Sequence, residues 1–179
     1  EQQAQQITTE AAGRGTRMHK YLENYVESDD LGQPGTNPYS QQSHKMASGI
    51  VETYLKEHFN EAWGSEVPLY YPGLYAGTCD LTGSWMGKPA ILDFKQTNKP
   101  KKLEYVQNYF LQLVAYAEAH NEIYGTNIRE GHIFMCSRGD DGMELGGETY
   151  QQFDVWPHEY DEWRTEWYNR VYTYYEKHQ

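Results

Sequence analysis

The chain has 179 residues, of which 15 are Lys or Arg and 26 are Asp or Glu, so its formal net charge is −11 with His neutral. This length permits one domain with a hydrophobic core, and an aromatic content of 15% argues against disorder. No apolar run approaches the roughly 18 residues that a bilayer-spanning helix requires, so we expect no membrane partner.

Only two cysteines are present, Cys79 and Cys136. Two thiols cannot supply the four thiolates of an iron–sulfur cluster or of a Cys₄ zinc site, so we expect neither cofactor. The low cysteine content also favours a reducing, intracellular compartment.

A net charge of −11 argues against a protein that binds nucleic acid over its whole surface, because phosphate binding depends on Lys and Arg. The positive charges are nevertheless concentrated in two windows. Residues 14–20 contain three bases and no acid, and residues 88–102 contain five lysines against Asp93 alone. These windows are where we expect a polyanion to be contacted.

Hydrophobic periodicity predicts a first helix over residues 7–26, with Thr8 or Thr9 as its N-cap. A loop is expected over 29–40, where Gly, Pro, Asn and Asp concentrate. Helical spacing returns over 43–62 and predicts a second helix.

The middle of the chain alternates with the period of two that indicates strands. Strands are expected over 67–71, 81–85 and 89–95, separated by turns at Pro72-Gly73 and Met86-Gly87. These three segments predict an antiparallel meander.

The C-terminal half predicts a helix over 103–123, a strand over 128–136, another over 149–155 and a closing helix over about 158–178. This order predicts an α/β fold with a central mixed sheet of four or five strands, flanked by helices on both faces. We expect a single domain over residues 1–179.

One group of residues in the meander can carry chemistry. Asp80 and Asp93 lie at similar distances from the turn at Met86-Gly87, so antiparallel pairing would bring them side by side. Lys95 shares the face of Asp93, and Phe94 points the other way into the core. Two carboxylates and a lysine can bind Mg²⁺ or Mn²⁺ and activate a water against a phosphodiester. The alternative is ordinary surface charge at a sheet edge.

The next helix carries a polar stripe, because Gln112 and Tyr116 share one side with Tyr105 and Tyr109. Tyrosine rings can stack on unpaired bases, although core packing is the alternative reading. His19 beside the apolar seam of the first helix is either a structural histidine or, with carboxylates opposite, a metal ligand.

The motifs occur in the order Gly15-x-x-x-His19, Glu66, Gly77-Thr78-x-Asp80, Asp93-x-Lys95 and Gln112-x-x-x-Tyr116. Together they resemble the PD-(D/E)XK nuclease superfamily, specifically its RecB-like branch, over roughly residues 8–178. The helix at 105–120 and the closing aromatic helix look most like the mitochondrial genome maintenance exonuclease and its phage or bacterial relatives.

The resemblance implies a restriction-endonuclease-like core over about residues 13–136. It implies that His19, Asp80 and Asp93 hold Mg²⁺ or Mn²⁺ together with the backbone carbonyl of Phe94. It also implies that Lys95 is the catalytic lysine.

Further roles follow from the same resemblance. Gln112 and Tyr116 match a motif that lines the site and orients DNA or the lysine, and Glu66 matches an acidic position that contributes to the metal site or supports it. One departure is visible, because Gln96 follows Lys95 where the family usually has Thr, and Thr97 comes one position late. We expect the DNA contacts to come from Arg14, Arg17, Lys99, Lys101, Lys102, Tyr105, Tyr109 and Tyr116.

The expected function is therefore a metal-dependent exonuclease that degrades single-stranded DNA from a free end, in DNA replication, repair or recombination. A phage or bacterial origin would place it in the bacterial cytoplasm, with replication or recombination proteins as further partners. One alternative is a structure-specific endonuclease or a Cas4-like end processor, although Cas4-like proteins usually carry four cysteines. Another is a non-enzymatic protein, either an acidic DNA mimic or a scaffold.

Overall fold

The computed structural model describes residues 1–138 and 147–179, and within them five strands form one mixed sheet in the order β1-β2-β3-β4-β5, flanked by helices. The predicted α/β class is confirmed. In chain order the elements are α1 (Gln2–Ser28), α2 (Pro38–Ile50), a π-helical turn (Val51–Leu55), α3 (Lys56–His58), β1 (Phe59–Tyr71), β2 (Tyr75–Trp85), β3 (Lys88–Thr97), a 3₁₀ turn (Leu103–Tyr105), α4 (Gln107–Tyr124), β4 (Gly131–Ser137), β5 (Thr149–Val155) and α5 (Pro157–Lys177).

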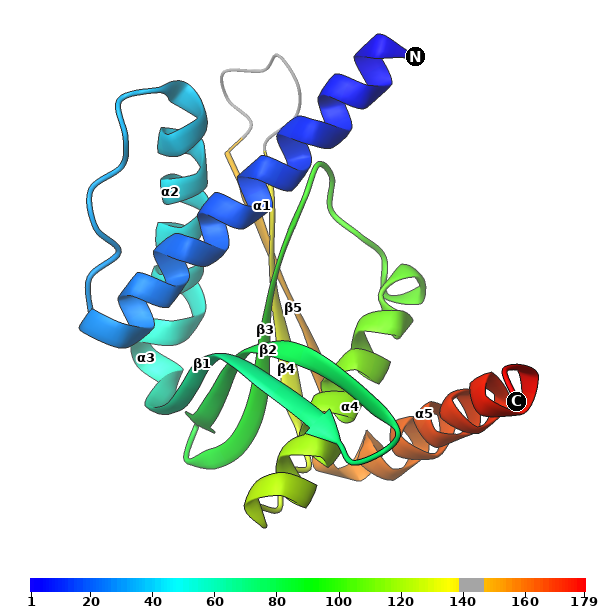
Figure 1. The fold of residues 1–179 in the computed structure, drawn as a ribbon. Coiled ribbons are helices and arrows are strands. Elements are labelled where there is room, and N and C mark those ends of the chain that lie inside the picture. The colour runs from blue at the N-terminus through cyan, green and yellow to red at the C-terminus, as the bar shows by residue number, and fades with distance from the viewer. Residues whose placement is uncertain (139–146) are drawn as a thin grey trace. The chain divides into compact units, whose positions relative to one another are not determined.

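The chain divides into two compact units, and it passes from one to the other within β3, β4 and β5. The first unit comprises Glu1–Phe59, Phe94–Pro100 and Phe134–Gln152, and the second comprises Asn60–Asp93, Lys101–Ile133 and Phe153–Gln179. In Figure 1, α1 packs on α2 within the first unit, and α5 packs on α4 within the second. Among the described residues, no helix has the length and apolarity needed to cross a bilayer.

The β2–β3 hairpin has the two-residue turn that its sequence predicts. Trp85 pairs with Lys88, and both loop residues adopt positive φ, 50° at Met86 and 78° at Gly87. Two positive φ values define the type I′ turn, whose twist matches that of the strands. Asn60 supports the turn, because its Oδ1 accepts a hydrogen bond of 2.7 Å from the Gly87 N–H.

Strand β4 runs parallel to β3. In the second unit Ile91 N–H donates to Glu130 O at 3.2 Å, and in the first Arg138 N–H donates to Thr97 O at 3.1 Å, so residue numbers rise together along both strands. A parallel neighbour requires a crossover connection, and α4 supplies it. The predicted strands over 128–136 and 149–155 correspond to β4 and β5.

Helix α1 begins earlier than predicted, and its N-cap prediction is wrong. Thr8 Oγ1 and Thr9 Oγ1 donate to the carbonyls of Ala4 and Gln5, four residues back, which are bonds inside a continuing helix. The predicted apolar face is confirmed, since Met18 and Leu22 are fully buried.

The predicted helix over 43–62 is wrong at both ends. Helix α2 starts at Pro38, because the side chain of Asn37 caps it by accepting from Ser40 N–H at 2.8 Å. The helical path ends at His58, and residues from Phe59 onward belong to β1. The bond from Asn60 to the β2–β3 turn is a long-range contact that outweighs the local helical pattern.

Helix α4 is shorter at its start than the predicted 103–123. Leu103 and Tyr105 lie in the separate 3₁₀ turn and are 61% and 69% exposed. The remainder of the predicted apolar stripe is confirmed, because Phe110, Leu113 and Ala117 are buried. The closing helix predicted over 158–178 corresponds to α5.

Candidate active site

The paired carboxylates lie on the β2–β3 hairpin, within the second unit. The register pairs Leu81 with Leu92 and continues regularly to Trp85 and Lys88 at the turn. Carried one step further from the turn, the same register sets Asp80 opposite Asp93. Asp93 is only 3% exposed, so it is not the solvated surface charge that was the alternative reading.

Glu66 adds a third carboxylate from β1. One of its carboxylate oxygens lies within 4.8 Å of one from Asp80. Because β1 begins at Phe59 and not at residue 67 as predicted, Glu66 lies inside the strand, with a φ of 49°. Non-glycine residues adopt this left-handed conformation at a cost of about 1–2 kcal/mol. The chain is tightly bent here, because a Cβ added at Gly64 would stand 2.5 Å from Val67 Cγ2.

The thiol of Cys79, on β2, lies in the electrostatic field of all three carboxylates. Cys79 is fully buried, and burial raises the pKa of its thiol well above the usual value. The negative charges of Asp93, Asp80 and Glu66 raise that pKa further. The thiol therefore stays protonated at neutral pH and is neither a nucleophile nor a thiolate ligand.

His19 and Phe94 meet in the first unit. His19 Nε2 lies 2.7 Å from the backbone oxygen of Phe94. The Phe94 side chain is 3% exposed, as predicted for a residue that points into the core, and its ring centroid lies 6.4 Å from that of Phe134. The structure thus brings together the imidazole and the carbonyl that the resemblance assigns to one metal ion.

The His19–Phe94 distance is compatible with that assignment. Neighbouring ligands of an octahedral Mg²⁺ at about 2.1 Å stand roughly 3.0 Å apart. The observed 2.7 Å between Nε2 and O is close to this value. Metal binding would require Nε2 to lose its proton and shift it to Nδ1, because a ring nitrogen that donates a hydrogen bond cannot ligate a metal. The donor set of carboxylates, carbonyl and imidazole fits Mg²⁺ or Mn²⁺.

The candidate ligands come from both units. Glu66, Asp80 and Asp93 belong to the second unit, and His19 and Phe94 belong to the first. Asp93 and Phe94 are joined by one peptide bond.

Lys95 and Gln96 continue β3, and both are partly exposed. Gln96 holds α1, because its Nε2 donates to Ala11 O at 2.9 Å and its Oε1 accepts from Arg14 Nε at 2.6 Å. A Cβ added at Gly15 would stand 3.1 Å from Gln96 Nε2, so the absence of a side chain at Gly15 leaves room for the Gln96 amide. The residue that departs from the family pattern thus connects the strand to the helix that carries His19.

Arg14 does not lie at the surface as a phosphate contact would. Its side chain is 1% exposed and bonds Gln96 Oε1 and, through Nη2, Asn98 Oδ1 at 2.5 Å. Burial lowers the pKa of its guanidinium, and the nearby Arg138 lowers it further. These contacts give Arg14 a structural role at the end of β3.

The predicted Gln112–Tyr116 pair is confirmed as a contact on α4, with Gln112 Nε2 donating to Tyr116 Oη at 3.1 Å. The ring of Tyr116 rests on β2, because a Cβ added at Gly77 would stand 2.9 Å from Tyr116 Cε1. Gly77 lies three residues before Asp80 in the same strand, so the motif glycine gives the α4 tyrosine access to the carboxylate strand.

The remaining predicted DNA contacts occupy varied positions. Lys101 Nζ donates to Tyr109 Oη at 3.2 Å and lies 5.4 Å from that ring's centroid. Arg17 Nε donates to Ser43 Oγ at 3.1 Å, and its guanidinium lies 5.9 Å from the Tyr39 ring centroid. The exposed members of the set are Lys99, Lys102 and Tyr105.

Sequence reasoning missed a buried histidine on β4. His132 is fully buried, with Nδ1 2.6 Å from Asp154 Oδ1 and Nε2 2.8 Å from Glu130 Oε2. Burial alone would lower its pKa, but the hydrogen bonds and charges of Asp154 and Glu130 outweigh burial and raise it. In the strand predicted over 128–136, the spacing Glu130-x-His132 puts both residues on one face, and that signal was available in the sequence.

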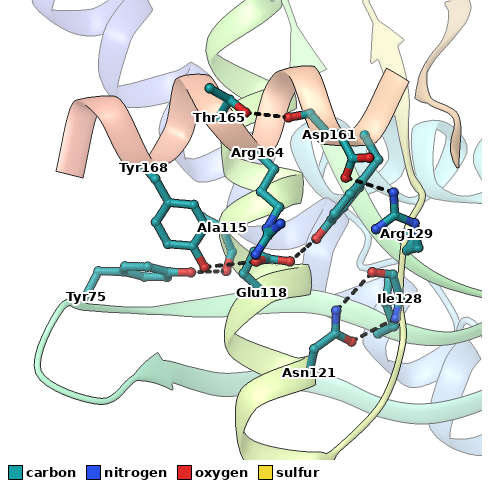
Figure 2. A network of polar contacts seen from close by, with 11 residues as sticks. Tyr75, Ala115, Glu118, Asn121, Ile128, Arg129, Asp161, Arg164, Thr165 and Tyr168 are labelled. Carbon is teal, nitrogen blue, oxygen red and sulfur yellow. Dashed lines mark hydrogen bonds and ion pairs between the residues drawn. The ribbon is translucent and has the colours of Figure 1, made fainter. Parts of the chain in front are cut away.

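A second missed cluster joins α4 to α5 around Glu118. Figure 2 shows the Glu118 carboxylate facing Arg164 and Tyr168 of α5, at 2.6 and 2.9 Å from Oε1. Its Oε2 accepts from the buried Tyr160 Oη at 2.6 Å. Arg129 adds an ion pair of 2.8 Å to Asp161 at the start of α5.

A comparison of the chain with protein-family models found no match, and a comparison with curated protein sequences found none either.

Proposed function

We propose that the chain is a metal-dependent nuclease of the PD-(D/E)XK type that hydrolyses single-stranded DNA from a free end. The observation that carries the proposal is the β2–β3 register. Extended by one residue beyond the Leu81–Leu92 pair, it sets Asp80 opposite Asp93, which is buried. The strand of Asp93 continues into Phe94, whose carbonyl already holds His19, and into Lys95.

In this proposal His19, Phe94 O, Asp80 and Asp93 hold Mg²⁺ or Mn²⁺, with Glu66 beside them. The ion would neutralise phosphate charge and lower the pKa of a bound water. Lys95 would place its ammonium against that water and the phosphate, and Gln112 with Tyr116 would orient the strand. The net charge of −11 means that the strand must be guided locally, by basic and aromatic groups, rather than by the overall field.

The decisive experiment compares end-labelled linear single-stranded DNA with a circular single strand, in Mg²⁺ and in EDTA. We expect cutting of the linear strand only, in Mg²⁺ only. Lys95→Ala should abolish it, and Lys88→Ala, which removes an exposed lysine from the same strand, should not. Cutting of the circle would establish a structure-specific endonuclease instead.

Metal binding can be measured without DNA. Mn²⁺ at a hundred times its Kd should stabilise the native state by about 2.7 kcal/mol. His19→Ala and Asp80→Asn should each remove most of that thermal shift. A wild-type chain that cuts neither DNA and shows no Mn²⁺ shift would instead favour an acidic DNA mimic or scaffold.

A further inference from the structure

A depression in the second unit lies where β2, α4 and α5 meet. Its volume is about 320 Å³, the lower end of the range for small-molecule sites. Gln112 and Tyr116 of the candidate active site line it together with Tyr75, Leu111 and Trp167. The lining is therefore aromatic and aliphatic, with an amide from the active-site stripe.

The aromatic lining is fixed by its own contacts. Tyr75 Oη donates to Ala115 O at 2.8 Å, which ties the ring to α4. The Trp167 ring lies edge-on to Tyr75, with centroids 5.0 Å apart and planes 86° apart. Tyr116 rests on Gly77, so this third ring is also held. Rings held in this way can stack on a flat ligand at little cost in side-chain entropy.

Arg170 supplies a positive charge at the same depression. Its Nη1 donates to Asn108 Oδ1 at 3.3 Å, and its Nε donates to Glu166 Oε1 at 3.1 Å. The Arg170–Glu166 pair is solvent-exposed, with side chains 55% and 48% exposed. Exposed pairs of this kind contribute only about 0.3–0.5 kcal/mol, so an arriving phosphate can take over the guanidinium.

Two neighbouring depressions also include Arg170, and their charges differ. One, of about 690 Å³, is lined by Glu159, Glu162 and Glu166 and would repel a polyanion. The other, of about 450 Å³, contains Tyr174, Lys177 and His178, with Glu166 as its one acid. For an anionic strand bound at Arg170, the neighbouring positive charge and aromatic ring are therefore Lys177 and Tyr174, near the C-terminal end of α5.

We propose that the depression at Trp167 and Arg170 is a subsite for one nucleotide of a single-stranded DNA. The base stacks among Trp167, Tyr75 and Tyr116, and the phosphate binds Arg170. The adjoining nucleotide lies toward Tyr174 and Lys177. This inference rests on the proposed function, because the strand bound at the subsite would be the substrate that is cut at the carboxylates.

Binding in EDTA tests the subsite without cleavage. The probes are a fluorescein-labelled thymidylate 12-mer and an abasic strand of the same length, followed by fluorescence anisotropy with the full chain. We expect Trp167→Leu to weaken binding of the thymidylate by about tenfold and to leave the abasic strand unaffected, because stacking is the interaction removed. Trp167→Phe keeps a ring and should retain most of the affinity.

Arg170→Gln should weaken binding of both strands and reduce the slope of log affinity against log salt by about 1, as expected when one phosphate contact is lost. The matched controls are Trp63→Leu and Lys88→Gln, which remove a ring and an exposed charge elsewhere in the same unit and should change neither affinity. Because Arg170 is exposed, its substitution does not endanger folding.

Equal affinity of the wild-type chain for the two strands would overturn the base subsite, as would a Trp167→Leu effect no larger than that of Trp63→Leu. Either result could coexist with metal-dependent cleavage that requires Lys95, which would leave the proposed function standing. Loss of that cleavage result, with base-dependent binding intact, would overturn the nuclease and retain the subsite.

Discussion

Tyr116 of α4 lies against Gly77 of β2 so closely that no side chain fits at residue 77. A Cβ there would stand 2.9 Å from Tyr116 Cε1 and 3.4 Å from its hydroxyl oxygen. Tyr116 is also the acceptor of the Gln112 side chain. The glycine of one motif and the tyrosine of another are thus parts of one packing arrangement beside the carboxylate strand.

Gly77→Ala should therefore displace the Tyr116 ring. We expect kcat/KM on linear single-stranded DNA to fall by roughly ten- to a hundredfold, the loss typical of a misplaced orienting group. Gly147→Ala is the control, because nothing lies within 4 Å of a Cβ there. Unchanged kcat/KM in Gly77→Ala would mean that Tyr116 has no part in the reaction.

Two substitutions at Glu66 separate the effect of its charge on metal binding from the effect of its backbone strain on stability. Both Glu66→Gly and Glu66→Ala remove the carboxylate, so both should reduce the Mn²⁺ thermal shift alike. At a φ of 49°, only glycine is relaxed, and Glu66→Gly should be about 1 kcal/mol more stable than Glu66→Ala in urea unfolding. Equal stabilities would show that the strand straightens once the carboxylate is gone.

The carboxylate hairpin could be predicted from sequence because its determinants are local. A two-residue turn at Met86-Gly87 makes the register a matter of counting, and the observed pairs from Leu81–Leu92 to Trp85–Lys88 agree with that count. The buried half of α4 was predictable for the same reason, since helical spacing alone defines its apolar face.

The environment of Arg14 could not be predicted in this way. A guanidinium within a run of basic residues reads as a surface charge. Its burial depends on Gln96 and Asn98, more than eighty residues later, whose amide oxygens satisfy two of its donors. Likewise, Asn60 was predicted to lie in a helix, because its hydrogen-bond partner, the Gly87 N–H, is distant in sequence.

Arg14→Lys should lower the free energy of unfolding by about 1–2 kcal/mol. An ammonium cannot reproduce the planar fork that bonds both Gln96 and Asn98, so at least one charge-assisted hydrogen bond is lost. Urea unfolding followed by circular dichroism measures the change. Arg17→Lys, which affects a less buried guanidinium in the same helix, should change stability by less than about 0.5 kcal/mol. Equal effects of the two substitutions would contradict the structural role.

The buried His132 should make stability depend on pH. Its pKa in the folded chain is raised, so its contribution is fully present below the unfolded value of about 6.5 and is lost as pH rises through the folded value. Between those two values the free energy of unfolding should fall by up to about 1.4 kcal/mol per pH unit.

Comparison with His132→Gln isolates that contribution. The gap in unfolding free energy between wild type and variant should narrow as pH increases from 6 to 9, because only the wild type loses a proton from this site. Parallel curves would show that the histidine is not held as an imidazolium by Asp154 and Glu130.

Glu118 should be the principal link between α4 and α5. Glu118→Ala leaves the hydroxyl of Tyr160, a residue that is 1% exposed, without its acceptor, and it removes the counter-charge of Arg164. Unsatisfied buried polar groups cost about 1–3 kcal/mol each, so we expect a loss of about 3 kcal/mol in urea unfolding. Glu118→Gln keeps an acceptor oxygen and should lose about half as much.

The matched control is Glu122→Ala, one turn later on α4, where the side chain is exposed. It removes the same functional group from the same helix and should change stability by less than about 0.5 kcal/mol. Because Trp167 and Arg170 lie on α5 beyond Tyr160, the Glu118 variants should also weaken thymidylate binding. A stability loss in Glu122→Ala equal to that in Glu118→Ala would attribute the effect to helix propensity rather than to the network in Figure 2.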